Sequence, residues 1–241
     1  MNNRLLISSL IFLSASTSAA TMPTGFYAKL GIGQSYGKND NFNIAATSSS
    51  TLNAKDSLDF KHSDSYQLAI GYRYPELSWL TTELSLNYNA KLKAQGDTFI
   101  INGTSYSEQS HQHIKSTTLM LSGQIDLASY FNQDDWLFHP YVGLGVGVSR
   151  NKLSDLSANE DNVSAGVVSL DNADTHTDFA WQTKLGVTYA ATKHIVLDLS
   201  YAYNDYGKVK AKSTTSGSTT YSSYEMNYRT QQIMLGMRYF F

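Results

Sequence analysis

Several segments of the chain have an apolar residue at every second position. Seven ionisable residues lie at the alternate positions of these segments. Neighbouring segments carry opposite charges, so the side chains could pair in a confined interior or could line a gated path for ions. We favour pairing, because charges removed from bulk water cost several kcal/mol each unless they are paired. The segment order predicts two groups, Lys184–Asp198–Arg238 and Arg73–Glu83. The full set is Lys29, Arg73, Glu83, Asp126, Lys184, Asp198 and Arg238.

Histidines are the natural candidates for metal ligands or catalytic bases. His111 and His113 are the best-spaced pair, but no third ligand with useful spacing lies nearby. No histidine is paired in sequence with a serine on an apolar face, as an enzyme acting on lipid would need. We therefore expect solvated histidines in loops, turns and strand ends, with no catalytic residue, metal or cofactor. The six are His62, His111, His113, His139, His176 and His194.

Two polar stretches could bind charged partners. Residues 150–178 are acidic, but the spacing of their carboxylates matches no calcium loop, so a solvated acidic loop is the simpler interpretation. Lys208, Lys210 and Lys212 form a basic stretch that could contact lipopolysaccharide phosphates or host glycans. The same three lysines could equally belong to a charged extension of a strand, and the sequence leaves both possibilities open.

The first 20 residues have the pattern of a secretory leader. Arg4 precedes an apolar run over Leu5–Ala15, and Ser18-Ala19-Ala20 supplies the small residues of a cleavage site. This run is shorter than the ~20 apolar residues that a membrane helix needs. We predict a cleaved signal peptide at 1–20 and one domain at 21–241. The chain has no cysteine, which excludes a disulfide scaffold and a lipid-modified cysteine after the leader.

The C-terminal stretch Glu225–Phe241 shows the period of two that defines a strand with two different faces. One face carries Ile233, Leu235, Met237, Tyr239 and Phe241, whereas the other carries Gln232, Met234, Gly236, Arg238 and Phe240. An apolar, aromatic-tipped face opposite a polar one is typical of a transmembrane barrel with lipid outside and a polar lumen inside.

Seven further segments alternate in the same way, so the sequence predicts an all-β fold. We expect an eight-stranded antiparallel up-and-down transmembrane barrel, closed because an open sheet edge in lipid leaves backbone groups unpaired. Short connections at 75–78, 129–137 and 191–194 alternate with long polar ones at 37–63, 91–113, 150–178 and 207–225. This asymmetry predicts short periplasmic turns and four long extracellular loops. The eight strands are Phe26–Tyr36, Asp64–Tyr74, Trp79–Ala90, Ile114–Leu127, Phe138–Ser149, Phe179–Ala190, Ile195–Tyr206 and Glu225–Phe241.

The alternative is a soluble eight-stranded barrel, which would bury the tyrosine-rich face and expose a glycine-rich face with few charges. That arrangement does not match an ordinary charged protein surface. With 18 basic and 20 acidic residues, the net charge is −2, and no basic stripe suggests nucleic acid as a partner. Aromatic residues of the apolar face gather near the strand ends, as expected for two interfacial girdles.

The chain resembles the small outer-membrane barrels of the opacity-protein and OmpA-transmembrane-domain type. The resemblance rests on the leader, Gly25-Phe26-Tyr27, His139–Ser149, Phe179–Tyr206 and the terminal Phe241. It implies recognition of the last strand by the outer-membrane assembly machinery, a Gram-negative outer-membrane location, and no catalytic residues to carry over. Full-length OmpA continues into a peptidoglycan-binding domain that this chain lacks, so we expect no cell-wall anchoring.

We therefore expect a non-enzymatic surface antigen or adhesin-like protein that acts through its extracellular loops, or one that stabilises the envelope. Its expected partners are outer-membrane lipid and lipopolysaccharide, the assembly machinery, and host surface ligands. A narrow channel or carrier for small solutes is the first alternative, and a lipid A-modifying barrel enzyme is the second.

Overall fold

The computed structural model describes residues 21–38, 43–46, 59–60, 62–96, 99–101, 104–106, 109–159, 169–170, 175–216 and 219–241. Side chains are described at 21–38, 62–90, 114–152, 175–209 and 227–241. The predicted leader at 1–20 lies outside these ranges. Parts of the four predicted loops lie outside them too.

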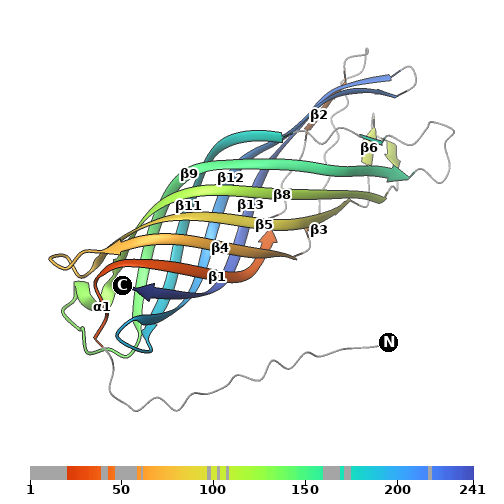
Figure 1. The fold of residues 1–241 in the computed structure, drawn as a ribbon. Helices are drawn as coiled ribbons and strands as arrows, with labels where there is room; N and C mark the ends of the chain where they lie inside the picture. The colour runs from red at the N-terminus through yellow and green to blue at the C-terminus, as the bar shows by residue number, and fades with distance from the viewer. Residues whose placement is uncertain are drawn as a thin grey trace, which may run out of the picture.

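Eight long antiparallel strands form one closed sheet, which confirms the predicted barrel (Figure 1). The neighbours follow the chain, in the order β1-β4-β5-β8-β9-β11-β12-β13, and β1 pairs with β13 to close the wall. The strands are β1 (Gly25–Gly37), β4 (His62–Arg73), β5 (Leu80–Gly96), β8 (Gln109–Asp126), β9 (His139–Asn159), β11 (Thr175–Ala190), β12 (Ile195–Ser216) and β13 (Thr219–Phe240).

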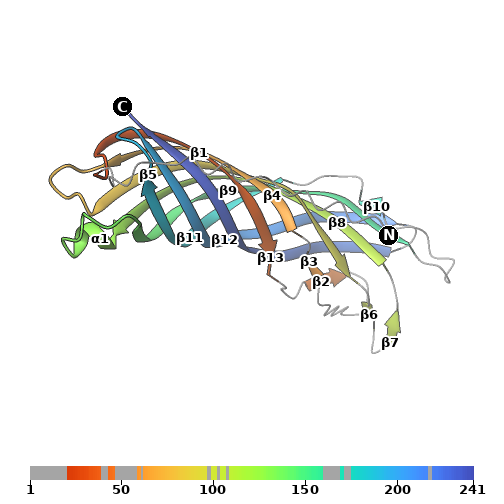
Figure 2. The ribbon, with the colours of Figure 1, turned by 90° about the horizontal axis from the view of Figure 1, so that it is seen from below.

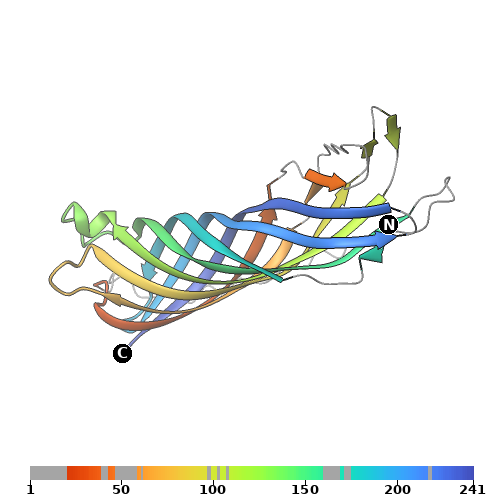
Figure 3. The same cartoon turned by 90° about the horizontal axis from the view of Figure 1, so that it is seen from above.

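Closure fixes how steeply the strands tilt. The row of paired residues that starts at Tyr27 passes Gly71, Glu83, Ser122, Gly145, Gln182, Asn204 and Thr230 and returns to β1 at Gly37. The row therefore rejoins its own strand ten residues further along. With ~3.3 Å per residue and ~4.8 Å between strands, this stagger corresponds to a tilt of about 40°. Figures 2 and 3 view the barrel from opposite sides and show the strands crossing its long axis obliquely.

The two faces of the wall differ as the alternation predicts. Leu197, Leu199 and Leu235 are exposed on the outside, whereas Arg73 and Arg238 are each only 5% exposed and lie inside. A soluble barrel would have the opposite arrangement, because its apolar side chains would fill a dry core. The exposed apolar face therefore fits a lipid environment.

The predicted loops are shorter than expected, because the strands continue beyond the membrane. The ladder of β5 and β8 runs on to Gly96–Ser110, that of β8 and β9 to Gln109–Asn159, and that of β12 and β13 to Ser216–Thr219. Outside lipid both faces of a strand meet water, so the apolar alternation disappears although the hydrogen-bonded ladder persists. Lys208, Lys210 and Lys212 thus lie in β12, as a strand extension.

Five short strands add to the end of the barrel that carries these extensions (Figures 1 and 2). β2 (Asn43–Ala46) pairs with β13, β3 (Asp59–Phe60) with β5, and β10 (Ser169–Leu170) with β9. A separate hairpin joins β6 (Phe99–Ile101) to β7 (Thr104–Tyr106).

The opposite end carries the short connections and the C-terminus (Figure 1). The turn after β8 begins with a one-turn helix, α1 (Leu127–Tyr130), whose N-cap is Asp126. The connections after β4 and β11 are brief, as predicted. Within the described residues, no helix is both long enough and apolar enough to span a membrane.

Candidate functional site

A cluster of charged side chains closes the lumen near its periplasmic half. Glu83 is fully buried on β5, where its Oε2 accepts a hydrogen bond of 2.9 Å from the Tyr27 hydroxyl and its Oε1 lies 3.4 Å from Lys184 Nζ. Lys29 Nζ lies 3.2 Å from Asp198 Oδ2 and 4.0 Å from Glu83 Oε2. The Glu83–Lys184 pair joins β5 to β11, which are separated by two strands, so the contact crosses the lumen.

Arg238 forms the second half of this cluster. Its guanidinium is paired with the Asp198 carboxylate through Nε and Nη2, and its Nη2 donates a 2.9 Å hydrogen bond to Gln124 Oε1 on β8. The guanidinium also lies over the rings of Tyr27 and Tyr141, at 5.2 and 5.4 Å from their centroids. A planar guanidinium can lie over an aromatic face and still donate hydrogen bonds within its own plane.

Glycines on the inner face make room for these large side chains. The Tyr141 ring lies against Gly186, where an added Cβ would approach Tyr141 Cε1 to 2.5 Å. The Tyr27 ring lies in the same manner against Gly71, where any Cβ would overlap it. Gly71 and Gly186 are therefore needed to admit the two rings that hold Arg238.

A second, smaller group of charges lies at the periplasmic mouth. Arg73 Nη2 lies 2.9 Å from Asp126 Oδ2 and donates a 2.8 Å hydrogen bond to Ser129 Oγ. Asp126 Oδ1 accepts hydrogen bonds from the backbone N–H groups of Ala128 and Ser129, so the same carboxylate caps α1. His139 Nδ1 also lies 2.9 Å from Asp126 Oδ2. This group ties the first turn of α1 to the inner wall.

Two ionisable residues have other surroundings than the sequence predicts. Arg73 pairs with Asp126 and not with Glu83, because Glu83 lies deeper in the lumen and is taken by Tyr27, Lys29 and Lys184. His139 is only 2% exposed and is part of this group, whereas we expected a solvated histidine. Neighbouring positions of the strands in the sheet do not by themselves predict the charge pairs, because long side chains reach across the narrow lumen. The side chains of His111 and His113 lie outside the described ones.

Above the charges, towards the extracellular end, the lumen is filled by uncharged polar side chains. Asn89 Oδ1 accepts hydrogen bonds from Ser65 Oγ at 2.8 Å, Ser35 Oγ at 3.2 Å and Gln232 Nε2 at 3.2 Å. Higher still, Tyr206 and Tyr228 are each 1% exposed and their ring centroids are 5.2 Å apart. The interior is thus occupied from the periplasmic mouth to this tyrosine pair.

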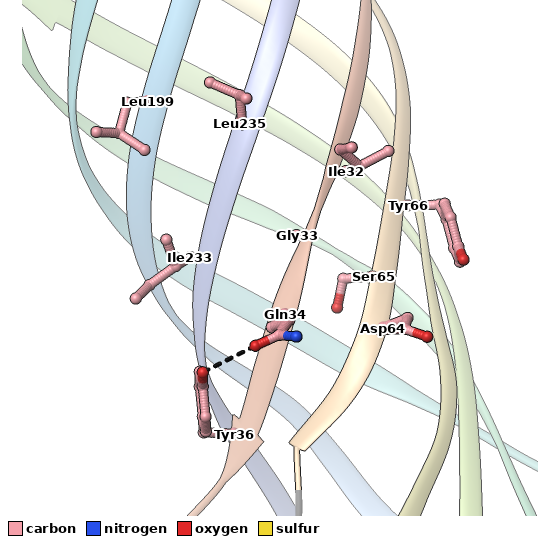
Figure 4. A pocket seen from close by; sticks show the side chains of 10 residues that line it. All are labelled: Ile32, Gly33, Gln34, Tyr36, Asp64, Ser65, Tyr66, Leu199, Ile233 and Leu235. Carbon is pink, nitrogen blue, oxygen red and sulfur yellow. Dashed lines mark hydrogen bonds between the residues drawn. The ribbon is translucent and has the colours of Figure 1, made fainter. Parts of the chain in front are cut away.

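The outer wall bears a shallow groove of about 580 Å³ across β12, β13, β1 and β4, where the sheet closes (Figure 4). Its floor is mainly apolar, with Ile32, Ile233 and Leu235 among the lining residues, and one end is polar, at Gln34 and Asp64. A 2.9 Å hydrogen bond from Tyr36 Oη to Gln34 Oε1 orders that end (Figure 4). A groove of this composition on a lipid-facing wall can accommodate an acyl chain.

The residues predicted as an assembly signal lie on this outer face of β13 and at Phe241, directly after its end. Each is exposed, and the terminal Phe241 is the most exposed of them at 79%. Tyr239 and Phe241 meet edge to face with centroids 5.6 Å apart. These side chains are therefore accessible both to lipid and to a protein partner. The five are Ile233, Leu235, Met237, Tyr239 and Phe241.

Comparison with known proteins identifies the family. The model of the outer membrane protein beta-barrel domain matches residues 5–241. The chain belongs to this family. It is therefore a protein of the Gram-negative outer membrane, and its exposed apolar wall faces lipid.

Curated relatives and solved structures agree with this assignment. Outer membrane protein PagN of Salmonella typhimurium is 29% identical over 182 residues, which cover 72% of this chain and 71% of PagN. A candidate adhesin of Rickettsia conorii, RC1281, is 26% identical over 172 residues, which cover 70% of this chain and 65% of that protein, slightly under two thirds. The structure of OprG from Pseudomonas aeruginosa has a TM-score of 0.62 at 14% identity, covering 93% of this chain and 100% of OprG. At that identity the structural likeness concerns the fold alone.

Among the described residues, no group of three or more His, Cys, Asp or Glu side chains could hold a metal ion. The seven predicted lumen residues are all buried, and they form the two groups of ion pairs described above. The apolar side chains of the outer wall, by contrast, are exposed.

Proposed function

We propose that the protein is a non-enzymatic adhesin-like surface protein, in which the barrel is an anchor and the extracellular strand extensions carry the binding surface. The observation that carries this proposal is the contrast between a filled lumen and a long extracellular end. The β12–β13 ladder continues from Tyr203 to Ser216. This is a rise of about 30 Å at ~2.5 Å per residue, beyond what is needed to cross the bilayer.

The curated relatives support the proposed adhesin-like function. A candidate adhesin of Rickettsia conorii and PagN align with more than two thirds of this chain. Extended strands can offer backbone groups to a partner, a common mode of recognition. Host surface ligands are accordingly the partners that we assign to this end.

A narrow channel is disfavoured by the charged cluster. Contacts between Glu83 and Lys184, and between Arg238 and Gln124, brace opposite walls of the lumen. An ion would have to break several buried contacts to pass, at a cost of several kcal/mol. We therefore assign the lumen charges a structural role, in which they fix the register of the strands and fill the interior.

Two features of biogenesis belong to the same proposal. Residues 1–20 act as a signal peptide removed during export, and residues 21–241 form the mature barrel domain. The outward side chains of the last strand, ending at Phe241, are recognised by the outer-membrane assembly machinery. Their regular exposure supports this role.

The test is adhesion of cells that display the protein on an otherwise non-adherent Gram-negative host. A variant in which a short turn replaces residues 207–227 should lose binding to cultured host cells while its heat-modifiable, folded form persists. Grafting the four extracellular segments onto an inert barrel should transfer binding. Undiminished adhesion after removal of all four segments would contradict the proposal.

A further inference from the structure

Three basic side chains lie together on the outer wall near the extracellular end. Lys115 on β8 and Lys152 on β9 are directly paired in the ladder, and Arg150 lies two residues before Lys152, hence on the same face. Ser149 and Asn151, the residues on either side of Arg150, are buried on the inner face. We call Lys115, Arg150 and Lys152 the basic patch.

The patch holds three like charges close together, two of them directly opposed in the ladder. Directly opposed like charges destabilise a strand pair. None of the acidic groups whose side chains are described forms an ion pair with these three residues. The nearby Asp178 is directed elsewhere, since its Oδ2 accepts a 2.9 Å hydrogen bond from the backbone N–H of Lys208. An anion seated at the patch would therefore relieve repulsion as well as gain attraction.

The height of the patch decides which anion it can meet. At a tilt of about 40°, each residue rises ~2.5 Å along the barrel axis and each step to the next strand changes the height by ~3 Å. Tyr88 and Trp181 lie on the outer wall near Lys115 and Arg150, and aromatic residues of this kind mark the upper interface. Tyr88 pairs with Thr117, so Lys115 lies roughly 8 Å above Tyr88. Trp181 pairs with Val146, so Arg150 lies about 7 Å above Trp181.

This level is just outside the hydrocarbon boundary, where the phosphate groups of outer-leaflet lipids lie. The patch also faces sideways from the wall, towards lipid. Thr117 and Thr177, the two ladder partners of Arg150, add exposed hydroxyl groups beside it. Arg supplies a planar fork for a phosphate and Lys a point charge, so the three residues suit a ligand with more than one phosphate.

We propose that the basic patch binds the phosphate groups of an outer-leaflet glycolipid of the lipopolysaccharide class. The bound lipid would be a fixed partner of the β8–β9 wall, distinct from any host ligand at the loops. This inference does not depend on adhesion, because it concerns the membrane interface at the base of the extracellular strand extensions.

The test measures binding of purified, folded protein in phospholipid nanodiscs to phosphorylated lipid A, to dephosphorylated lipid A and to inorganic phosphate. Each of Lys115→Gln, Arg150→Gln and Lys152→Gln should weaken binding of phosphorylated lipid A about five-fold, and the triple variant on the order of 100-fold, given ~1 kcal/mol per basic residue near a charged surface. Lys193→Gln, which removes an exposed lysine from the periplasmic turn at 191–194, is the matched control and should bind like the unaltered chain.

Folding is checked separately for each variant by its heat-modifiable mobility. Weak binding of dephosphorylated lipid A and of inorganic phosphate, with loss of affinity as salt rises, supports a lipid-phosphate site. Equal affinity of the triple variant and the unaltered chain would overturn the proposal. Tighter binding of a sulfated glycan than of lipid A, lost in the same variants, would also overturn it, since the patch would then be a glycan site.

Discussion

Asp198→Asn tests whether the buried charges hold the barrel together. Asp198 accepts contacts from Lys29 Nζ, the Arg238 guanidinium and the Tyr141 hydroxyl, and it is 1% exposed. The central cluster contains three cations, Lys29, Lys184 and Arg238, against the two carboxylates of Glu83 and Asp198. Loss of the Asp198 charge would leave one carboxylate for three cations. Breaking a buried pair in this way costs about 3–5 kcal/mol, and we expect a loss of that size.

The same strand supplies a matched control. Asp205 on β12 faces outward and lies 2.9 Å from Arg229 Nε, with the Arg229 side chain 37% and the Asp205 side chain 16% exposed. A pair screened by solvent contributes about 0–1 kcal/mol, so Asp205→Asn should change stability by less than 1 kcal/mol. The assay is urea-induced unfolding in phospholipid vesicles, followed by tryptophan fluorescence.

A double variant separates the ionic effect from a loss of packing. Arg238→Gln added to Asp198→Asn removes a cation that has lost its partner, so the double variant should be less destabilised than the sum of the two single variants. If Asp198→Asn costs less than 1 kcal/mol, or if the two substitutions are simply additive, the buried pairs do not stabilise the fold as described.

Three further outcomes follow from the geometry. Gly186→Ala should abolish the folded, heat-modifiable form, because a Cβ there would overlap the Tyr141 ring. Gly123→Ala is the control and should fold normally, because an added Cβ there has nothing within 4 Å. Equal folding of the two variants would contradict the packing inside the lumen. The unaltered protein should be electrically silent in planar lipid bilayers, and Arg238→Ala should give intermittent conductance if the plug is loosened; steady conductance of the unaltered chain would support the channel alternative instead. Phe241→Ser should reduce the amount of folded protein in the outer membrane several-fold while Phe241→Tyr should not, as measured by fractionation; equal amounts would argue against the assembly role.

Most of the transmembrane architecture could be predicted from the sequence, because lipid imposes a strict period of two. The outward leucines and the inward charges of β12 alternate within one strand, as at Leu197, Asp198 and Leu199. This pattern holds only over the membrane. Beyond the membrane, residues such as Thr214, Thr215 and Thr219 continue the strands. The only sequence feature that favours a strand there is their β-branched character.

The partners within the lumen could be predicted less well. Sequence order suggested that charges on neighbouring strands would pair, which is correct for Arg238 with Asp198 but wrong for Arg73 with Glu83. The lumen is narrow enough for Lys184 to reach Glu83 across it, and pairing therefore depends on height along the axis as much as on strand order. Height follows from the stagger of the closed sheet, which the sequence does not state.

The most direct measurement tests which face of the wall meets lipid. Because the chain has no native cysteine, single cysteines at Leu197, Leu199 and Leu235 can each carry a nitroxide label in protein reconstituted into vesicles. We expect all three labels to collide readily with oxygen dissolved in lipid and only weakly with a water-soluble nickel chelate. Labels shielded from both reagents, as in a dry protein core, would contradict the lipid-facing wall and the paired charges within it.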